Sequence, residues 1–273
     1  MKKTLVAIAA LATVGAAFAQ SSVTLYGRID ASIGSQRTTN NGNVAGATVD
    51  AGTQVLAGAH TGNRWGMKGS EDLGGGLKAN FQLESGFNVD TGSSAQGGLL
   101  FGRQAWVGLS GGFGEVRVGK PWTAYDDVSG AINAMFDSGF SVENNFFKST
   151  GYNANPANTV RYSTPTFGGF SGAFSHSMDE VKNVNTDVNS VSIAYAGGPF
   201  AAGFGYQTEG LAAGGKTKYT RLSASYDLGA AVIKGLYGNV KNPGSFKTNE
   251  YSIGVDVPEI GRASCRERVS RCV

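Results

Sequence analysis

The alternation of apolar and polar side chains along residues 20–34 constrains the fold of this chain more than any other feature. Successive side chains of an extended strand point to opposite faces, so every second residue lies on the same face. One face would carry Val23, Leu25, Ile29, Ala31 and Ile33, and the other Thr24, Tyr26, Arg28, Asp30 and Ser32. A strand with one apolar face and one charged face is typical of a wall between lipid and water.

A secretory signal sequence precedes this strand. Lys2 and Lys3 are followed by an apolar run over residues 5–18 and by a small-x-small cleavage motif that ends at Ala19. The run is too short to cross a bilayer as a helix, which takes about 20 apolar residues. We therefore predict that residues 1–19 form a signal peptide cleaved near Ala19; the alternative is an uncleaved anchor.

The composition favours a β-protein without a cofactor. The 42 glycines and 6 prolines, with 10% aromatic residues, suit many short strands joined by tight turns. Outside the two ends of the chain the basic and acidic residues nearly balance, so a nucleic-acid partner has no support. The two histidines, His60 and His176, have no cysteine nearby in the sequence, so neither a metal site nor a Ser-His-Asp site is indicated. We predict that the protein is not an enzyme.

Strands and turns alternate along most of the chain. Short polar or glycine-rich turns fall at residues 71–76, 111–115, 166–169, 197–199 and 227–230, and longer polar segments at 35–57, 88–98, 121–158, 178–189, 208–218 and 240–248. In a barrel of antiparallel strands the short turns face one side of the membrane and the long loops the other. We predict an all-β transmembrane antiparallel barrel, with about twelve strands up to Val257.

Arginines on the polar faces of these strands indicate a water-filled interior. Arg28, Arg64, Arg161 and Arg221 are each flanked by apolar residues of the opposite face. A dry core would not accommodate such charges. We therefore predict that the strands surround a hydrated lumen.

Four segments carry a resemblance to a known family: QSSVTLYGRIDASI from residue 20, NRWGMKGSEDLGGGLKANFQLESGF from residue 63, LFGRQAWVGLSGGFGEVRVGK from residue 100 and NTVRYSTPTFGGFSGAFSHS from residue 158. Through them the chain, up to about residue 257, resembles the general diffusion porins of the Gram-negative outer membrane. The resemblance implies a sixteen-stranded barrel that assembles as a homotrimer in outer-membrane lipid, with the third long loop folded into the pore. It also implies passive passage of small hydrophilic solutes and ions, without a cofactor.

The same resemblance implies a constriction in which basic residues of the wall face acidic residues of the inward loop. The basic row would be Arg28, Arg64, Arg103 and Arg161, and the acids Asp126, Asp127 and Asp137. Asp137 is the best match to the acid at the tip of the loop. Strand parity places Arg28, Arg64 and Arg161 inward. Arg103 shares parity with Val107, and it faces the lumen only in the register that turns Trp106 outward to lipid, which the resemblance favours.

Opposed charges across a narrow aqueous gap set up a transverse field in which a polar solute can orient its dipole. With four arginines in the wall we predict a mild anion preference, which salt weakens because exposed charges are screened over about 8 Å at physiological ionic strength. For any single arginine the alternative is a structural ion pair with a neighbouring acid. For the whole protein the alternative is a structural or adhesive outer-membrane barrel without an open channel. A barrel enzyme is disfavoured by the scarcity of histidine.

Residues 259–273 depart from the pattern. They contain four arginines and both cysteines, do not alternate, and end without an aromatic strand. We predict that residues 20–258 form a partial barrel, with about twelve of the sixteen strands that the resemblance implies, and that residues 259–273 are foreign to it. Because an unclosed barrel exposes unpaired backbone groups to lipid, a working pore would belong to the complete gene product.

Overall fold

The computed structural model describes residues 22–35, 37–39, 48–50, 52–58, 60–129, 143, 146–179, 181, 184–244 and 247–257. The predicted signal peptide, residues 259–273 and Asp137 lie outside these described residues.

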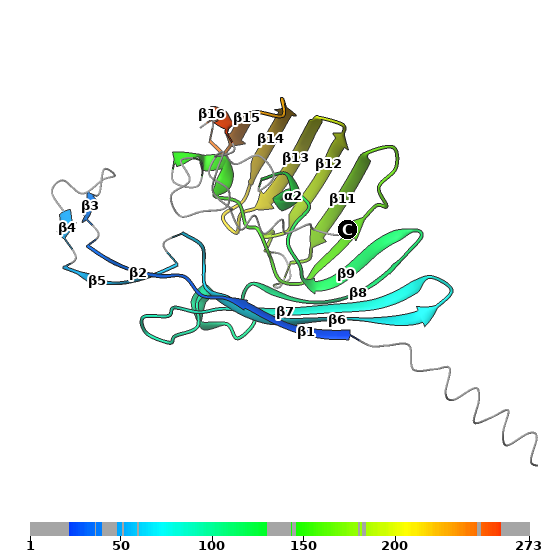
Figure 1. Cartoon of the computed structure of the whole chain (residues 1–273), viewed down its shortest axis with the longest axis horizontal. Coiled ribbons are helices and arrows are strands. Elements are labelled where there is room, and N and C mark those ends of the chain that lie inside the picture. The colour runs from blue at the N-terminus through cyan, green and yellow to red at the C-terminus, as the bar shows by residue number, and fades with distance from the viewer. Residues whose placement is uncertain are drawn as a thin grey trace, which may run out of the picture.

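One curved antiparallel sheet of twelve strands is the main element of the described part of the chain (Figure 1). Each strand pairs with its neighbours in the chain order β1-β6-β7-β8-β9-β10-β11-β12-β13-β14-β15-β16. The strands are β1 (Ser22–Arg28), β6 (Arg64–Gly74), β7 (Leu77–Gly86), β8 (Gln104–Gly111), β9 (Gly114–Lys120), β10 (Thr159–Ser163), β11 (Phe170–Ser177), β12 (Val188–Gly197), β13 (Phe200–Gly210), β14 (Lys216–Asp227), β15 (Val232–Lys241) and β16 (Lys247–Asp256). The prediction of about twelve antiparallel strands is confirmed.

The first hairpin extends beyond this sheet. β2 (Ala31–Gly34) continues the direction of β1 and pairs with β5 (Gln54–Ala57), which leads into β6. A small ladder of β3 (Arg37–Thr39) and β4 (Thr48–Asp50) follows at its tip. The predicted long segment over residues 35–57 is therefore partly a continuation of the hairpin.

The short turns lie where the sequence predicts them. β12 and β13, for example, are joined by Gly198 and Pro199 alone, and Gly198 has a φ of +54°, a conformation in which a side chain is disfavoured. Two of the predicted long loops are shorter than expected, however. β13 and β14 are joined by residues 211–215 and β15 and β16 by residues 242–246, because the polar residues predicted as loop continue the ladders in register.

The two faces of the sheet differ as the alternation predicts. On β14 the side chains of Arg221 and Ser223 point inward and are buried, whereas Leu222 between them points outward and is exposed. On β16 the outward Ile253 is 86% exposed. The outer face is thus apolar and the inner face polar, as a wall between lipid and water requires. No helix among the described residues is both long enough and apolar enough to cross a membrane.

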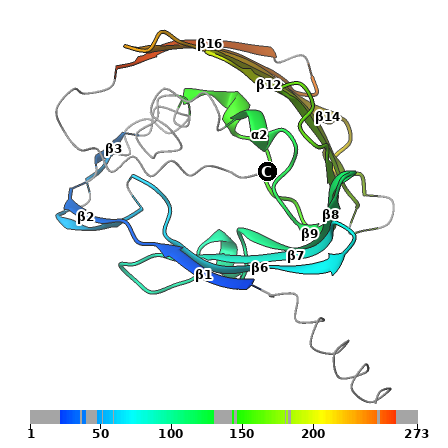
Figure 2. The ribbon, with the colours of Figure 1, turned by 45° about the vertical axis from the view of Figure 1, so that its right-hand side comes forward.

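The segment between β9 and β10 folds inside the arc of the sheet. Its short helix α2 (Asp126–Ser129) packs against β12, β13 and β14, and its 3₁₀ turn η2 (Lys148–Thr150) packs against β14 and β15. Figure 2 shows α2 within the concave side of the arc. The prediction that the third long loop folds inward is confirmed. A second 3₁₀ turn, η1 (Gln96–Gly98), lies between β7 and β8.

The sheet does not close on itself. β1 and β16 are its two edges, and Figure 2 shows them on opposite sides of the open arc. Closure into a barrel would require each edge to pair with a further strand.

Candidate functional site

Two arginines meet at the end of the first hairpin, on the inner face of the sheet. Arg28 of β1 lies directly opposite Arg64 of β6. Both donate to the Oγ1 atom of Thr61, Arg28 through Nη1 and Arg64 through Nη2, each at 3.1 Å. Arg64 also donates through Nε to the carbonyl oxygen of Gly62, at 3.1 Å. Like charges that face each other across a ladder repel, so shared neutral acceptors help to hold them side by side.

Asp30 shapes the turn that presents Thr61. Its Oδ2 atom accepts hydrogen bonds from the backbone N–H groups of His60, at 2.7 Å, and Thr61, at 2.6 Å. The backbone N–H of Asp30 in turn donates to Oδ1 of Asn63. The Asp30 carboxylate thus binds backbone amides of this turn.

Arg103 joins the same neighbourhood from the segment just before β8. Its Nε donates to Oε1 of Glu84 at 2.6 Å, and its guanidinium lies 5.3 Å from the ring centroid of Trp122. Its Nη1 is close to Gly62, because a Cβ added to that glycine would lie 3.9 Å away. Arg28, Arg64 and Arg103 therefore gather around residues 61–62.

The predicted orientation of Trp106 is wrong. The indole is 7% exposed and points inward, where its Nε1 donates to Oε1 of Gln104 at 2.9 Å and the Arg117 guanidinium lies 4.3 Å from its ring centroid. Arg103 nevertheless reaches the inner face, because it precedes the first residue of β8 and the alternation of that strand does not extend to it.

Glu84 is held by a hydrogen-bond network on the inner face. Besides Arg103, it accepts from the hydroxyl of Tyr26 at 2.9 Å, and Gln82 Nε2 donates to that hydroxyl at 2.6 Å. Glu84 is buried among these partners. Glu84 thus supplies a fixed counter-charge next to Arg103.

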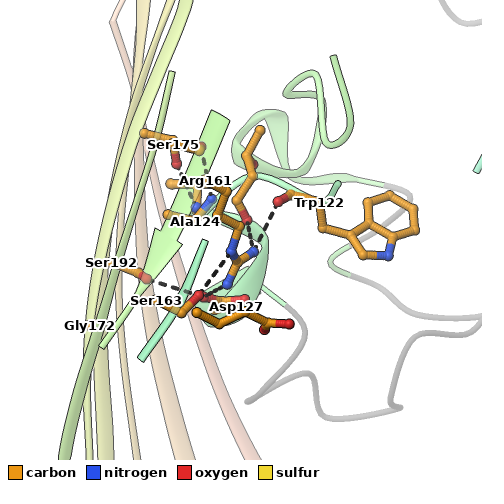
Figure 3. A network of polar contacts seen from close by, with 12 residues as sticks. Trp122, Ala124, Asp127, Arg161, Ser163, Gly172, Ser175 and Ser192 are labelled. Carbon is orange, nitrogen blue, oxygen red and sulfur yellow. Dashed lines mark hydrogen bonds and ion pairs between the residues drawn. The ribbon is translucent and has the colours of Figure 1, made fainter. Parts of the chain in front are cut away.

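Arg161 has a different environment from the other three predicted wall arginines. It is only 6% exposed, and its Nη1 donates to the carbonyl oxygens of Trp122, at 2.9 Å, and Thr123, at 3.0 Å. Its Nη2 forms an ion pair of 2.6 Å with Oδ2 of Asp127, and its Nε donates to Oγ of Ser163 (Figure 3). Arg161 fastens the start of the inward loop to the wall, which is the structural alternative considered for a single arginine.

Two of the predicted loop acids, Asp126 and Asp127, also have partners. Asp127 accepts from Arg161 and from Oγ of Ser192, at 3.3 Å (Figure 3). Asp126, the preceding residue of α2, accepts from the hydroxyl of Tyr152 at 2.6 Å. Asp137 lies outside the described residues. The contacts of Asp127 thus reach the wall, and Asp126 contacts Tyr152 within the loop.

This combination of an apolar outer face, a charged inner face and an inward loop agrees with the comparison to known proteins. The family model described as "Gram-negative porin" matches residues 4–265. The chain belongs to the Gram-negative porin family. Its location is the outer membrane, and the family consists of channels and not of enzymes.

The sequence of this porin is similar to those of several outer membrane porins. Outer membrane porin protein 32 of Delftia acidovorans is 37% identical over 285 residues, which cover 94% of this chain and 76% of the relative. An outer membrane porin protein of Bordetella pertussis is 41% identical over 212 residues, covering 72% of this chain and 53% of the relative. The chain thus spans about half the length of that second relative.

A solved structure supports the same fold. The anion-selective porin from Comamonas acidovorans matches with a TM-score of 0.72 and 29% sequence identity, over 89% of this chain and 75% of that chain. OmpF of Salmonella typhi matches with a TM-score of 0.61 at 17% identity, over 85% of this chain and 73% of that chain, a likeness of fold alone.

Sequence reasoning missed most of the contacts that hold the inward loop of this porin. The backbone N–H groups of Ala124 and Tyr125 donate to Oγ of Ser175, at 3.2 Å, and of Ser190, at 2.6 Å. Farther along the loop, the backbone N–H of Ser149 donates to the Glu250 carboxylate at 3.0 Å. Serines at alternate inward positions of β11 and β12 could have predicted where the loop binds. Small polar side chains leave room for a loop, and their hydroxyl oxygens can accept hydrogen bonds from its backbone N–H groups.

Tyr125 is the centre of the small apolar cluster between this loop and the wall. It is fully buried, and its ring centroid lies 4.7 Å from that of Tyr152 and 6.3 Å from that of Tyr219. Burial raises the pKa of the Tyr125 phenol well above its ordinary value. The hydroxyl therefore stays protonated and donates to the carbonyl oxygen of Ser149 at 3.2 Å.

Proposed function

We propose that the complete protein forms a water-filled channel for passive diffusion of small hydrophilic solutes and ions, with a mild preference for anions. The observation that carries the proposal is the group formed by Arg28, Arg64 and Arg103 around residues 61–62, with Trp122 of the inward loop beside it. Three guanidinium groups on one side of a lumen outnumber the two nearby carboxylates, Glu84 and Asp30, and give that wall a positive potential. A solved structure that this chain resembles is that of an anion-selective porin.

Within this proposal the four wall arginines have two different roles. Arg28, Arg64 and Arg103 supply the field at the constriction, whereas Arg161 with Asp127 holds the loop that narrows it. Asp126 and Asp137 remain the candidates for acids on the opposing side. A solute that enters would orient its dipole between these groups, and an anion would exchange part of its hydration for guanidinium contacts.

The assembly and the limits of the domains are also part of the proposal. The complete protein would close its barrel with further strands next to β1 and β16 and would assemble as a homotrimer. Residues 1–19 would be the signal peptide, residues 20–258 the barrel segment and residues 259–273 a segment foreign to the barrel. The family match covers residues 4–265. The proposed boundary between residues 258 and 259 therefore lies inside the matched region.

Ion selectivity of the complete protein in a planar bilayer tests the proposal. The variant R64Q/R103Q removes two of the three clustered charges, and we expect its reversal potential in a salt gradient to shift toward cations. Arg117→Gln is the control, because Arg117 also faces the lumen but contacts Glu115 and Trp106, outside the group around residues 61–62. Unchanged selectivity of R64Q/R103Q would refute the role of the arginines, and absence of any conductance in the unaltered protein would favour a structural or adhesive barrel.

A further inference from the structure

The side chain of Tyr26 reaches across the inner face of the sheet to a carboxylate two strands away. Tyr26 lies on β1 directly opposite Gly66 of β6, and Gly66 lies opposite Glu84 of β7. The phenol passes over this glycine, because a Cβ added to Gly66 would lie 2.9 Å from Cζ of Tyr26 and 2.8 Å from its hydroxyl oxygen. The absence of a side chain at position 66 thus gives the tyrosine its path to Glu84.

The hydrogen bonds of the Tyr26 hydroxyl run in one direction. Gln82 Nε2 donates to the hydroxyl oxygen at 2.6 Å, and the hydroxyl in turn donates to Oε2 of Glu84 at 2.9 Å. Successive hydrogen bonds of this kind polarise one another and strengthen the chain that they form. Gln82 therefore directs the hydroxyl hydrogen of Tyr26 toward Glu84, and one oxygen of this buried carboxylate is occupied.

The other oxygen of Glu84 holds Arg103. Nε of Arg103 donates to Oε1 at 2.6 Å, and the backbone N–H of Arg103 donates to the backbone carbonyl oxygen of Glu84 at 3.2 Å. Within the part of the chain that the structure describes, the Nε contact is the one side-chain hydrogen bond of Arg103. Arginine and carboxylate groups frequently pair through two parallel hydrogen bonds. Here Tyr26 occupies the second oxygen, so the pair forms through a single N–H.

We propose that Tyr26 is a positioning residue of the constriction: it keeps the Arg103–Glu84 pair singly hydrogen-bonded and leaves the terminal Nη groups of Arg103 to an anion in the lumen. This inference rests on the proposed channel function and deepens it, because it names a neutral residue that sets the strength of the anion preference. Tyr26 touches no solute in this role and acts through Glu84.

Removal of the Tyr26 hydroxyl would change the pairing of Arg103. Oε2 of Glu84 would become a buried acceptor without a donor, which is unfavourable. The guanidinium of Arg103 is already bound to the same carboxylate, and its planar fork can supply a second N–H in parallel with Nε. Arg103 would then turn a terminal N–H from the lumen to Glu84, and less of its positive charge would face a passing anion.

Reversal potentials of the complete protein in a salt gradient test the proposal through the variant Tyr26→Phe. This substitution removes only the hydroxyl and keeps the ring and every charge of the constriction. We expect the anion-to-cation permeability ratio to fall about two-fold, because one of three clustered guanidinium groups turns partly away from the lumen. Glu84→Gln should raise the ratio, since it removes the carboxylate. In the Glu84→Gln background, Tyr26→Phe should have no further effect, which a merely structural role would not produce.

Tyr237→Phe is the matched control, because its hydroxyl lies on the outer face, where it donates to Oδ1 of Asn249 at 3.2 Å. The control should leave the permeability ratio unchanged, and circular dichroism of each variant verifies that the β-structure is intact. An unchanged ratio in Tyr26→Phe, an equal fall in the control, or an equal fall in the Glu84→Gln background would overturn the proposal.

The variant Arg103→Gln separates failure of this inference from failure of the channel proposal. If Arg103→Gln lowers the anion-to-cation permeability ratio and Tyr26→Phe does not, the positioning role of Tyr26 is refuted and the role of the arginines stands. If neither substitution changes the ratio, the proposed role of the arginines fails together with that of Tyr26.

Discussion

The ion pair between Arg161 and Asp127 offers the sharpest test of how the inward loop is held against the wall. Asp127→Asn keeps the shape of the side chain and removes its charge. Loss of one partner of a buried ion pair costs about 3–5 kcal/mol, and a hydrogen bond to a charged group contributes about 1.5–3 kcal/mol. The smaller free-energy range, that of a single hydrogen bond to a charged group, applies to this pair. The Asp127 side chain is 32% exposed, and Arg161 keeps Ser163 and two backbone carbonyls as acceptors.

We therefore expect Asp127→Asn to weaken docking of the loop by about 2 kcal/mol, which raises the undocked population about 30-fold. Amide hydrogen exchange over residues 122–129 measures this population, because the N–H groups of Ala124 and Tyr125 donate to wall serines only while the loop is docked. Exchange in β14 and β15 serves as the internal reference.

Asp126→Asn is the matched control for this experiment. Asp126 lies beside Asp127 in α2, but its hydroxyl partner, Tyr152, belongs to the loop itself and not to the wall. Its replacement should change exchange over residues 122–129 by no more than a few-fold. The hypothesis that the Arg161–Asp127 ion pair holds the loop against the wall fails if Asp127→Asn leaves exchange unaltered, or if Asp126→Asn accelerates it equally. In a double-mutant cycle with Arg161→Gln, the second substitution should add little to the first.

Two further predictions concern the charges and the buried tyrosine. Glu84→Gln removes the carboxylate that pairs with Arg103, so the reversal potential of the complete protein should move farther toward anions; a shift toward cations would contradict the assigned geometry. Because burial raises the pKa of Tyr125, its contribution to loop docking is fully present below about pH 10 and is lost as the pH rises above that value. Fluorescence of Trp122 in the same loop should report this alkaline transition, and Tyr125→Phe should abolish it.

The strands and their two faces followed from the sequence alone. The alternation of side chains along an extended backbone is a local property, so Leu222 and Arg221 could be assigned to opposite faces without knowledge of their neighbours. The inward course of the third loop came from the resemblance to porins, since the composition of residues 121–158 does not distinguish an inward loop from an external one.

Tertiary structure alone decided which arginines face water and which hold the loop. Arg28, Arg64 and Arg161 have the same parity and similar flanking residues, yet Arg161 is buried because Trp122, Thr123 and Asp127 from a distant segment supply acceptors for its guanidinium. The inward turn of Trp106 likewise depends on where β8 begins and on Arg117 of the next strand. Strand periodicity is determined within a few residues, whereas the burial of a charge depends on acceptors that only the folded chain brings together.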